Sequence, residues 1–298
     1  METRGMHRVR VLRRLVLPML RKLDLGDITI RHHWTRDALS LHSFRHKGYW
    51  YHGRRRECST MEVFPELLRS GDFVVEIGAH IGYVSLYLAH LIGSKGRLVV
   101  FEPGPNNLPY LRQNTKSYPN IAIVEKAVTD HTGSAKFFVE NLTGQNNSLL
   151  DHYSVLQDNE RWAFIKSVDE EVVEVECTTL DDFLTEGAPA VPSFIKIDVE
   201  GSELCVLKGM EDTLRRRDVA LMVEVTENAT DVFRLLHDAE FHLFLPDKSQ
   251  LNDPRDVKGN VFCLKADDQR ISVFFAKGMR VGLGPLGRFS NDSIPRAL

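Results

Sequence analysis

The stretch from residue 72 to residue 107 constrains the fold of this chain more than any other. It reads DFVVEIGAHIGYVSLYLAHLIGSKGRLVVFEPGPNN. Two short runs, 73–77 and 97–101, are largely apolar, which is typical of parallel strands that are buried on both faces. Between them come glycines and a segment with apolar residues at helical spacing. This order predicts a strand, a glycine turn, a helix and a second strand, and hence an α/β fold around a mostly parallel sheet.

The glycine turn has the features of a ligand-binding turn. Glycine lets the backbone come close to a ligand, and the helix that follows offers free N–H groups at its start. Glu102 follows Gly82 at the distance, about 20 residues, at which a carboxylate can accept hydrogen bonds from a ribose diol. The glycines stand as Gly78-x-x-x-Gly82, with Glu76 before them, and not as G-x-G-x-x-G. This spacing makes a nicotinamide-dependent oxidoreductase the weaker interpretation.

A second stretch that carries chemistry is 193–210, SFIKIDVEGSELCVLKGM. Its first half predicts a buried strand, and ligands of open parallel sheets bind at the carboxyl ends of strands. Asp198 and Glu200, two residues apart at that end, are expected to point to the same side. One of them would act as general base on a hydroxyl, or the pair would hold a cation. In the alternative, Glu200 and Glu203 only cap a helix over 202–216.

Other segments add candidate residues at the same edge. The strand predicted over 219–225 contains Glu224 near its end, and the amide-rich loop 141–150 contains Asn147 and Ser148. Such a loop either faces a ligand or is a plain surface loop. The alternating residues 172–177 predict an edge strand.

The N-terminal part of the chain differs from the rest. Residues 1–25 mix arginines with apolar residues, a pattern that suits the surface of an anionic membrane or a helix packed on its own domain. Residues 27–53 are rich in aromatic rings and histidines, which could form a substrate-facing cap. The spacing of the histidines favours simple packing over a metal site. We therefore expect an extension and cap over 1–60, the main domain over 61–276 and a tail over 277–298.

Composition sets further bounds. A chain of 298 residues with 43% hydrophobic residues can bury a large core. The net charge of −3 argues against nucleic-acid binding, which needs a basic surface. The four cysteines form no C-x-x-C pair, so the cysteines predict no zinc site, and free cysteines suit the reducing cytoplasm. No apolar stretch is long enough to span a membrane.

Taken together, the motifs resemble those of the FkbM family of S-adenosylmethionine (SAM)-dependent methyltransferases. The matching segments are VVEIGAHIGYVSL, VVFEPGPNN, AVTDHTG, NNSL, FIKIDVEGSELCVLKGM and LMVEV. The resemblance implies a Rossmann-like class I methyltransferase fold: a mostly parallel twisted sheet, helices on both faces and an antiparallel C-terminal strand. It also implies SAM as cofactor and O-methylation of a hydroxyl on a sugar, glycolipid, polysaccharide or other secondary metabolite.

The resemblance also assigns roles around the cofactor. Glu76, Gly78, His80 and Gly82 would shape the methionine end of the SAM site. Glu102 would hold the ribose. Asp130, in the AVTDHTG turn, would contact the adenine or merely cap its own turn.

The remaining roles concern the acceptor. Asp198, together with His80 or Glu200, would take or orient the proton of a small-molecule or glycan acceptor. Asn147, Ser148 and Glu224 would face that acceptor. The alternatives outside this class are a non-catalytic Rossmann-fold scaffold and a cytoplasmic protein held at the membrane surface by residues 1–25.

Overall fold

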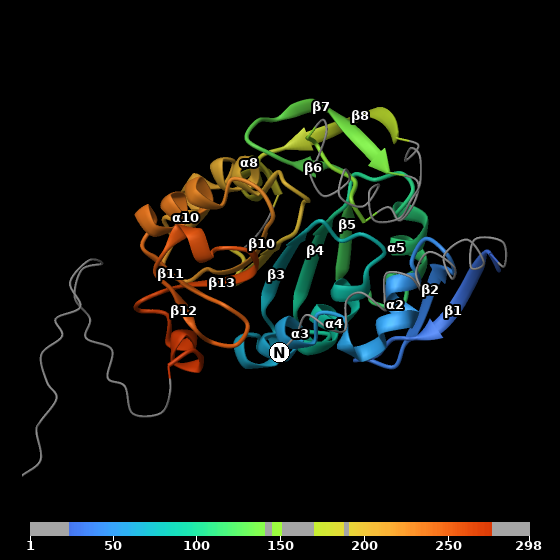
Figure 1. Cartoon of the computed structure of the whole chain (residues 1–298), viewed down its shortest axis with the longest axis horizontal. Coiled ribbons are helices and arrows are strands. Elements are labelled where there is room, and N and C mark those ends of the chain that lie inside the picture. Colours follow the sequence, from blue (N-terminus) through green and yellow to red (C-terminus); the bar gives the residue numbers. More distant parts are fainter. Residues whose placement is uncertain (1–23, 141–144, 151–169, 188–190, 276–298) are drawn as a thin grey trace, which may run out of the picture.

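The centre of the protein is a sheet of eight strands with helices on both of its faces (Figure 1). This computed structural model describes residues 24–140, 145–150, 170–187 and 191–275. In spatial order the strands are β12 (Gln250–Leu251), β11 (Phe241–Phe244), β13 (Gly259–Lys265), β10 (Ala220–Val225), β9 (Phe194–Ile197), β3 (Phe73–Ile77), β4 (Arg97–Phe101) and β5 (Ile121–Val124). The run from β10 to β5 is parallel, whereas β13 is antiparallel to both of its neighbours. The predicted fold class is therefore confirmed.

The strand order reverses between β3 and β9. From β3 the chain moves outward to β4 and β5, and it later returns to β9 on the other side of β3. In the register, Ile77 lies beside both Phe101 and Ile197. The residues that follow these three strand ends therefore leave the sheet at one level, at the reversal point where open α/β sheets bind their ligands.

Helices cover both faces because successive residues of the central strands point to opposite sides. Val74 packs in the core on one face of the sheet, and Val75 packs in the core on the other. The first face carries α3 (Cys58–Leu67), α4 (Tyr83–Ile92) and α5 (Leu108–Thr115). The second carries α7 (Leu180–Gly187), α8 (Glu203–Lys208), α9 (Glu211–Leu214) and α10 (Ala229–Asp238). Short 3-10 helices are η1 (Gly53–Arg55), η2 (Pro254–Asp256) and η3 (Gln269–Val273).

A small three-stranded sheet lies beyond the end of β5, at the top of Figure 1. Its order is β6 (Ala127–Val128), β8 (Glu170–Thr178) and β7 (Gly133–Glu140). The prediction of an edge strand over 172–177 is wrong, because β8 is the middle strand and pairs on both sides. Alternation of apolar and polar residues shows that a strand has one buried and one exposed face. It does not show whether one or both edges of the strand pair with other strands.

The single helix predicted over 202–216 is also wrong. The structure has two short helices, α8 and α9, separated at Gly209. A Cβ on Gly209 would lie 2.0 Å from the carbonyl oxygen of Thr129. The helix breaks where the backbone of another segment comes too close for any side chain.

The N-terminal segment packs on the first-face helices. It contains the hairpin of β1 (Asp27–Arg31) and β2 (Ala38–His42), followed by α2 (Lys47–His52). Asn114 of α5 donates hydrogen bonds to the carbonyl oxygens of Ser40, at 3.0 Å, and Ile81, at 2.8 Å. One amide thus joins the hairpin to the turn after β3.

Several sequence-based expectations concern residues outside the described ranges. These are the basic segment 1–25 for all but its last two residues, residues 141–144 of the amide-rich loop and the tail 277–298. Within the described ranges, no helix has the length and apolar character needed to cross a membrane. The domain boundaries at 60 and 276 and the cytoplasmic location stay predictions.

Candidate active site

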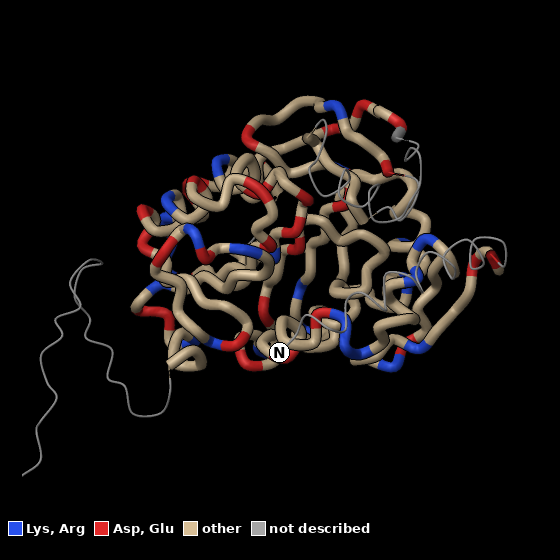
Figure 2. Tube along the Cα trace, in the orientation of Figure 1, with Lys and Arg blue, Asp and Glu red and all other residues tan. Residues whose placement is uncertain are grey.

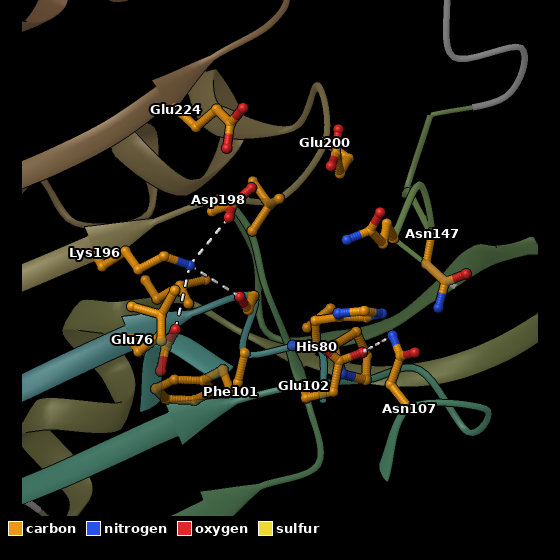
Figure 3. A pocket seen from close by; sticks show the side chains of 18 of the residues that line it. Glu76, His80, Phe101, Glu102, Asn107, Asn147, Lys196, Asp198, Glu200 and Glu224 are labelled. Atoms are coloured by element: carbon orange, nitrogen blue, oxygen red, sulfur yellow. Dashed lines mark hydrogen bonds and ion pairs between the residues drawn. The ribbon is translucent and has the colours of Figure 1, made fainter. Parts of the chain in front are cut away.

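A pocket opens at the strand-order reversal, where β3, β4, β9 and β10 end (Figure 3). Gly78 lines it and adopts a φ of 86°, a conformation that favours glycine. A Cβ at Gly78 would lie 1.7 Å from the backbone oxygen of Asp198. The turn after β3 therefore rests directly on the backbone that follows β9.

Gly82 has a different position. It precedes α4 with a φ of 85°, and a Cβ there would lie 2.9 Å from Leu111 Cδ1 of α5. Gly82 allows α4 and α5 to approach each other and is not among the residues that line the pocket. The geometry thus gives it a packing role and no direct contact with a ligand in the pocket.

Glu102, directly after β4, joins the loops on this side of the pocket. Its carboxylate accepts hydrogen bonds from the backbone N–H of His80 at 2.7 Å and of Gly104 at 2.9 Å, and from Asn107 Nδ2 at 3.2 Å. Burial raises the pKa of Glu102 to about 7, although these three hydrogen bonds lower it. The carboxyl group lines the pocket, as its predicted role at a ribose requires.

Lys196, in the middle of β9, is a site residue that the sequence analysis missed. Its Nζ lies 3.1 Å from Asp198 Oδ2 and 3.3 Å from Glu76 Oε1, and it donates to the carbonyl oxygen of Gly78 at 3.2 Å (Figure 3). Burial alone would lower the pKa of Lys196, but the charges of Asp198 and Glu76 outweigh it and raise the pKa. The sequence feature that could have identified it is a lysine inside an otherwise apolar strand, because lysines are buried almost only when they are paired with an opposite charge.

Glu76 is fully buried beneath the glycine turn. Ser85 Oγ of α4 donates to its Oε2 at 2.5 Å, and Lys196 holds its other oxygen. Burial raises the pKa of Glu76, while Lys196 and Ser85 lower it. Glu76 lines the pocket floor and joins β3 to α4 and β9.

Three acidic residues, Asp198, Glu200 and Glu224, line the opposite wall. The expected common side of Asp198 and Glu200 does not follow from strand alternation, because β9 ends at Ile197 and Glu200 has a φ of 51°. The nearby negative charge of Asp198, followed by burial, raises the pKa of Glu224. In Figure 3 the side chain of Asp198 points toward Lys196, whereas Glu200 lies away from Lys196.

Glu203 supports the turn between β9 and α8. It is buried, and its Oε1 accepts hydrogen bonds from Gly201 N at 2.8 Å and from Thr226 Oγ1 at 3.1 Å. Of the two alternatives weighed for Glu203, the structure favours the one in which it braces its own helix start.

Two further predicted residues lie away from the pocket lining. Ser148 is buried behind the wall, where its hydroxyl donates to the carbonyl oxygen of Glu200 at 2.7 Å. It therefore holds the backbone at Glu200 and is not among the described residues that line the pocket. Asp130 is exposed and pairs with His131 at 2.9 Å, so the turn-capping alternative fits it better than an adenine contact.

Asn147 does line the pocket, and its side chain is fixed on both sides. Its Oδ1 accepts from Glu140 N at 2.8 Å, and its Nδ2 donates to Asn106 Oδ1 at 2.8 Å. These bonds hold the described part of the amide-rich loop over the pocket edge.

The N-terminal cap contributes Tyr49, Arg56 and Glu57 to the pocket lining. The Tyr49 hydroxyl lies 2.9 Å from His80 Nδ1, and the two rings are stacked with centroids 5.9 Å apart. His80 thus links the cap to Glu102 through its backbone N–H. His32 and His33 do not line the pocket among the described residues, but both rings contact Tyr83, which does.

Comparison with known proteins gives one family. The methyltransferase FkbM domain matches residues 76–251, which is more than half of the 298-residue chain. The hexuronic acid methyltransferase AglP of Haloferax volcanii is 22% identical over 188 residues, covering 62% of this chain and 70% of that protein. The 31-O-demethyl-FK506 methyltransferase FkbM of Streptomyces tacrolimicus is 30% identical over 162 residues, covering 49% and 62% respectively.

A crystal structure of a methyltransferase FkbM from Methylobacillus flagellatus KT is also similar. It has a TM-score of 0.44 and 19% identity, and the match covers 66% of this chain and 45% of that one. The chain thus spans less than two thirds of the length of some of the relatives it matches. The family match over residues 76–251 nevertheless includes the glycine turn, Glu102, Lys196 and Asp198. The chain belongs to the family of FkbM-domain methyltransferases, whose cofactor is S-adenosylmethionine.

Proposed function

We propose that this chain transfers the methyl group of SAM to a hydroxyl oxygen of an acceptor. The observation that carries the proposal is the position of Asp198. Its carboxylate lies against the Lys196 ammonium and leaves the sheet at the same level as the glycine turn and Glu102. A base for a hydroxyl and a site for the cofactor therefore share one pocket.

The residues on the Glu102 side fit the cofactor. Glu102 carries a carboxylate that faces the pocket and can accept hydrogen bonds from the ribose hydroxyls. Gly78 leaves the turn after β3 without a side chain at the place where the methionine end would lie. When bound, SAM supplies a methyl group already activated on a positively charged sulfur, and the acidic pocket wall suits that charge.

Asp198 would do the proton chemistry. The acceptor hydroxyl oxygen forms a bond to the methyl carbon, its proton passes to the Asp198 carboxylate, and the carbon–sulfur electron pair stays on sulfur. Lys196 keeps Asp198 in a fixed orientation because the same ammonium also binds Glu76 and the Gly78 carbonyl. The protein then contributes mainly positioning and a proton acceptor.

For the acceptor, we propose a hydroxyl of a sugar, glycolipid, polysaccharide or other secondary metabolite. Support comes from the names of relatives, which include a hexuronic acid methyltransferase and a 2-O-methyltransferase, NoeI of Sinorhizobium fredii. NoeI is 24% identical over 177 residues, covering 55% of this chain and 69% of that protein. A small-molecule or glycan acceptor suits a pocket with both carboxylate and aromatic walls.

The test is calorimetric titration of the purified protein with SAM, S-adenosylhomocysteine and NADH. If SAM and S-adenosylhomocysteine bind and NADH does not, the result supports the methyltransferase assignment and removes the oxidoreductase alternative. Folded protein that binds neither adenosyl compound would refute the proposal and favour a scaffold. Methyl transfer from labelled SAM to a panel of glycan and lipid hydroxyls then identifies the acceptor.

A further inference from the structure

Arg56 extends from the cap into the pocket wall and has a fixed orientation. Its guanidinium lies 4.4 Å from the centroid of the Tyr49 ring, and a Cβ on Gly48 would lie 2.9 Å from its Nη1. Its Nη2 pairs with Glu57 Oε1 at 3.2 Å. The flat group is therefore held between an aromatic face, a glycine and a carboxylate, as suits the recognition of another planar group.

The hydrogen-bonding capacity of Arg56 is not used up by these contacts. A guanidinium has five N–H donors in a fixed fork. Its Nε is enclosed by protein, yet it has no hydrogen-bond partner among the residues that the structure describes. Buried donors in native proteins almost always have a partner, so an enclosed donor in a pocket wall points to a ligand.

Among the lysines and arginines that line the pocket in the described part of the chain, Arg56 is the one with a buried donor that lacks a hydrogen-bond partner. Six acidic side chains line the pocket: Glu57, Glu76, Glu102, Asp198, Glu200 and Glu224. Figure 2 shows acidic positions in red both near the middle of the molecule and around its periphery. Of the basic side chains in the described lining, Lys196 is held by Glu76 and Asp198, and Lys126 pairs with Glu176 at 3.0 Å.

We propose that Arg56 is the anion-binding residue of this pocket and that it takes a carboxylate. The proposal rests on the proposed function, because the carboxylate belongs to a molecule that enters the same site. A planar monoanion matches the fork of the guanidinium, whereas a doubly charged phosphate would be repelled by the acidic walls. The carboxylate comes either from the methionine part of the cofactor or from an acidic acceptor such as a uronic acid.

The test uses Arg56→Met, which keeps an unbranched aliphatic side chain and removes the guanidinium charge. Arg55→Met is the matched control, since Arg55 is exposed and not among the residues that line the pocket. Each protein is titrated with S-adenosylhomocysteine and with 5′-methylthioadenosine, which lacks the amino-acid carboxylate. The S-adenosylhomocysteine complexes are then titrated with D-glucuronate, and with D-glucose as the neutral probe.

If Arg56 holds the cofactor carboxylate, Arg56→Met weakens S-adenosylhomocysteine at least tenfold and leaves 5′-methylthioadenosine unchanged. If Arg56 holds an acceptor carboxylate, Arg56→Met leaves the affinities for S-adenosylhomocysteine and 5′-methylthioadenosine unchanged. D-glucuronate then binds the S-adenosylhomocysteine complexes of native protein and of Arg55→Met but not that of Arg56→Met, and D-glucose binds none of them. The proposal is overturned if Arg56→Met changes neither S-adenosylhomocysteine nor D-glucuronate binding.

The two proposals fail in different ways. If native protein binds neither adenosyl compound, the proposed function fails, and D-glucuronate titration of the cofactor-free protein still tests Arg56. If Arg56→Met does not fold, as judged by thermal melting, Gly48→Ala replaces it. Its added methyl group would lie 2.9 Å from Nη1, so the guanidinium must shift, and binding of the same carboxylate is expected to weaken.

Discussion

The affinity for S-adenosylhomocysteine is expected to fall as the pH falls through neutrality, because Glu102 must be ionised to accept both ribose hydroxyls. Burial raises the pKa of Glu102 to about 7 in the ligand-free protein. The ionised fraction is therefore roughly 0.9 at about pH 8 and roughly 0.1 at about pH 6. Binding that needs the carboxylate weakens about tenfold between these values, which is about 1.4 kcal/mol.

The assay is calorimetry at both ends of this range, in buffers with different ionisation enthalpies. At about pH 6, binding should release roughly 0.9 proton per ligand, because the ribose hydroxyls favour the ionised carboxylate. Glu102→Gln should bind more weakly and lose this pH dependence.

Glu203→Gln is the matched control for the same experiment. Burial also raises the pKa of Glu203 to about 7, but its Oε1 is bound to Gly201 N and it does not line the pocket. The pH dependence of binding should survive this substitution. An affinity that is constant across the range, with no proton release, would refute Glu102 as the ribose ligand.

Three further predictions concern the opposite wall. Asp198→Asn should reduce methyl transfer about 10²–10⁴-fold while S-adenosylhomocysteine affinity stays the same; an active variant would exclude Asp198 as the base. Lys196→Met should lower the free energy of unfolding in urea by about 3–5 kcal/mol, because Glu76 is then left buried without its cation; an unchanged midpoint would contradict this. Glu224→Gln should retain most of the turnover at neutral pH, since the charge of Asp198 raises the pKa of Glu224 and favours its neutral form; a loss as large as that of Asp198→Asn would show that Glu224 acts as a carboxylate.

The sequence predicted the parts of the site that depend on local pattern. Gly78, Glu102 and Asp198 each follow directly after a strand, and a strand end in a parallel sheet determines where the next residue lies. For this reason the sequence predicts these residues at one edge of the sheet, and in the structure all three line the pocket.

The parts that depend on tertiary partners were not predictable in this way. Lys196 is buried only because Glu76, from another strand, lies beside it, and Arg56 reaches the pocket only because the cap folds over α4. Gly82 was expected near the cofactor, but in the structure side chains of α5 lie where a side chain of Gly82 would be. The pattern of glycines in the turn gives no information on this neighbour. Ser148 likewise depends on the distant carbonyl of Glu200.

The contact between Gly78 and the backbone oxygen of Asp198 has a consequence for how specificity can change in this family. In the proposed mechanism, the spacing between the methyl donor and the base depends on two backbones in contact, and among side chains it depends on Lys196, which orients Asp198. The cap residue Tyr49 and the edge residue Asn147 line the pocket away from this contact, so we expect substitutions there to change the acceptor and not the reaction geometry. Any side chain at Gly78, in contrast, should impair cofactor affinity and turnover together, because it separates the two walls at once.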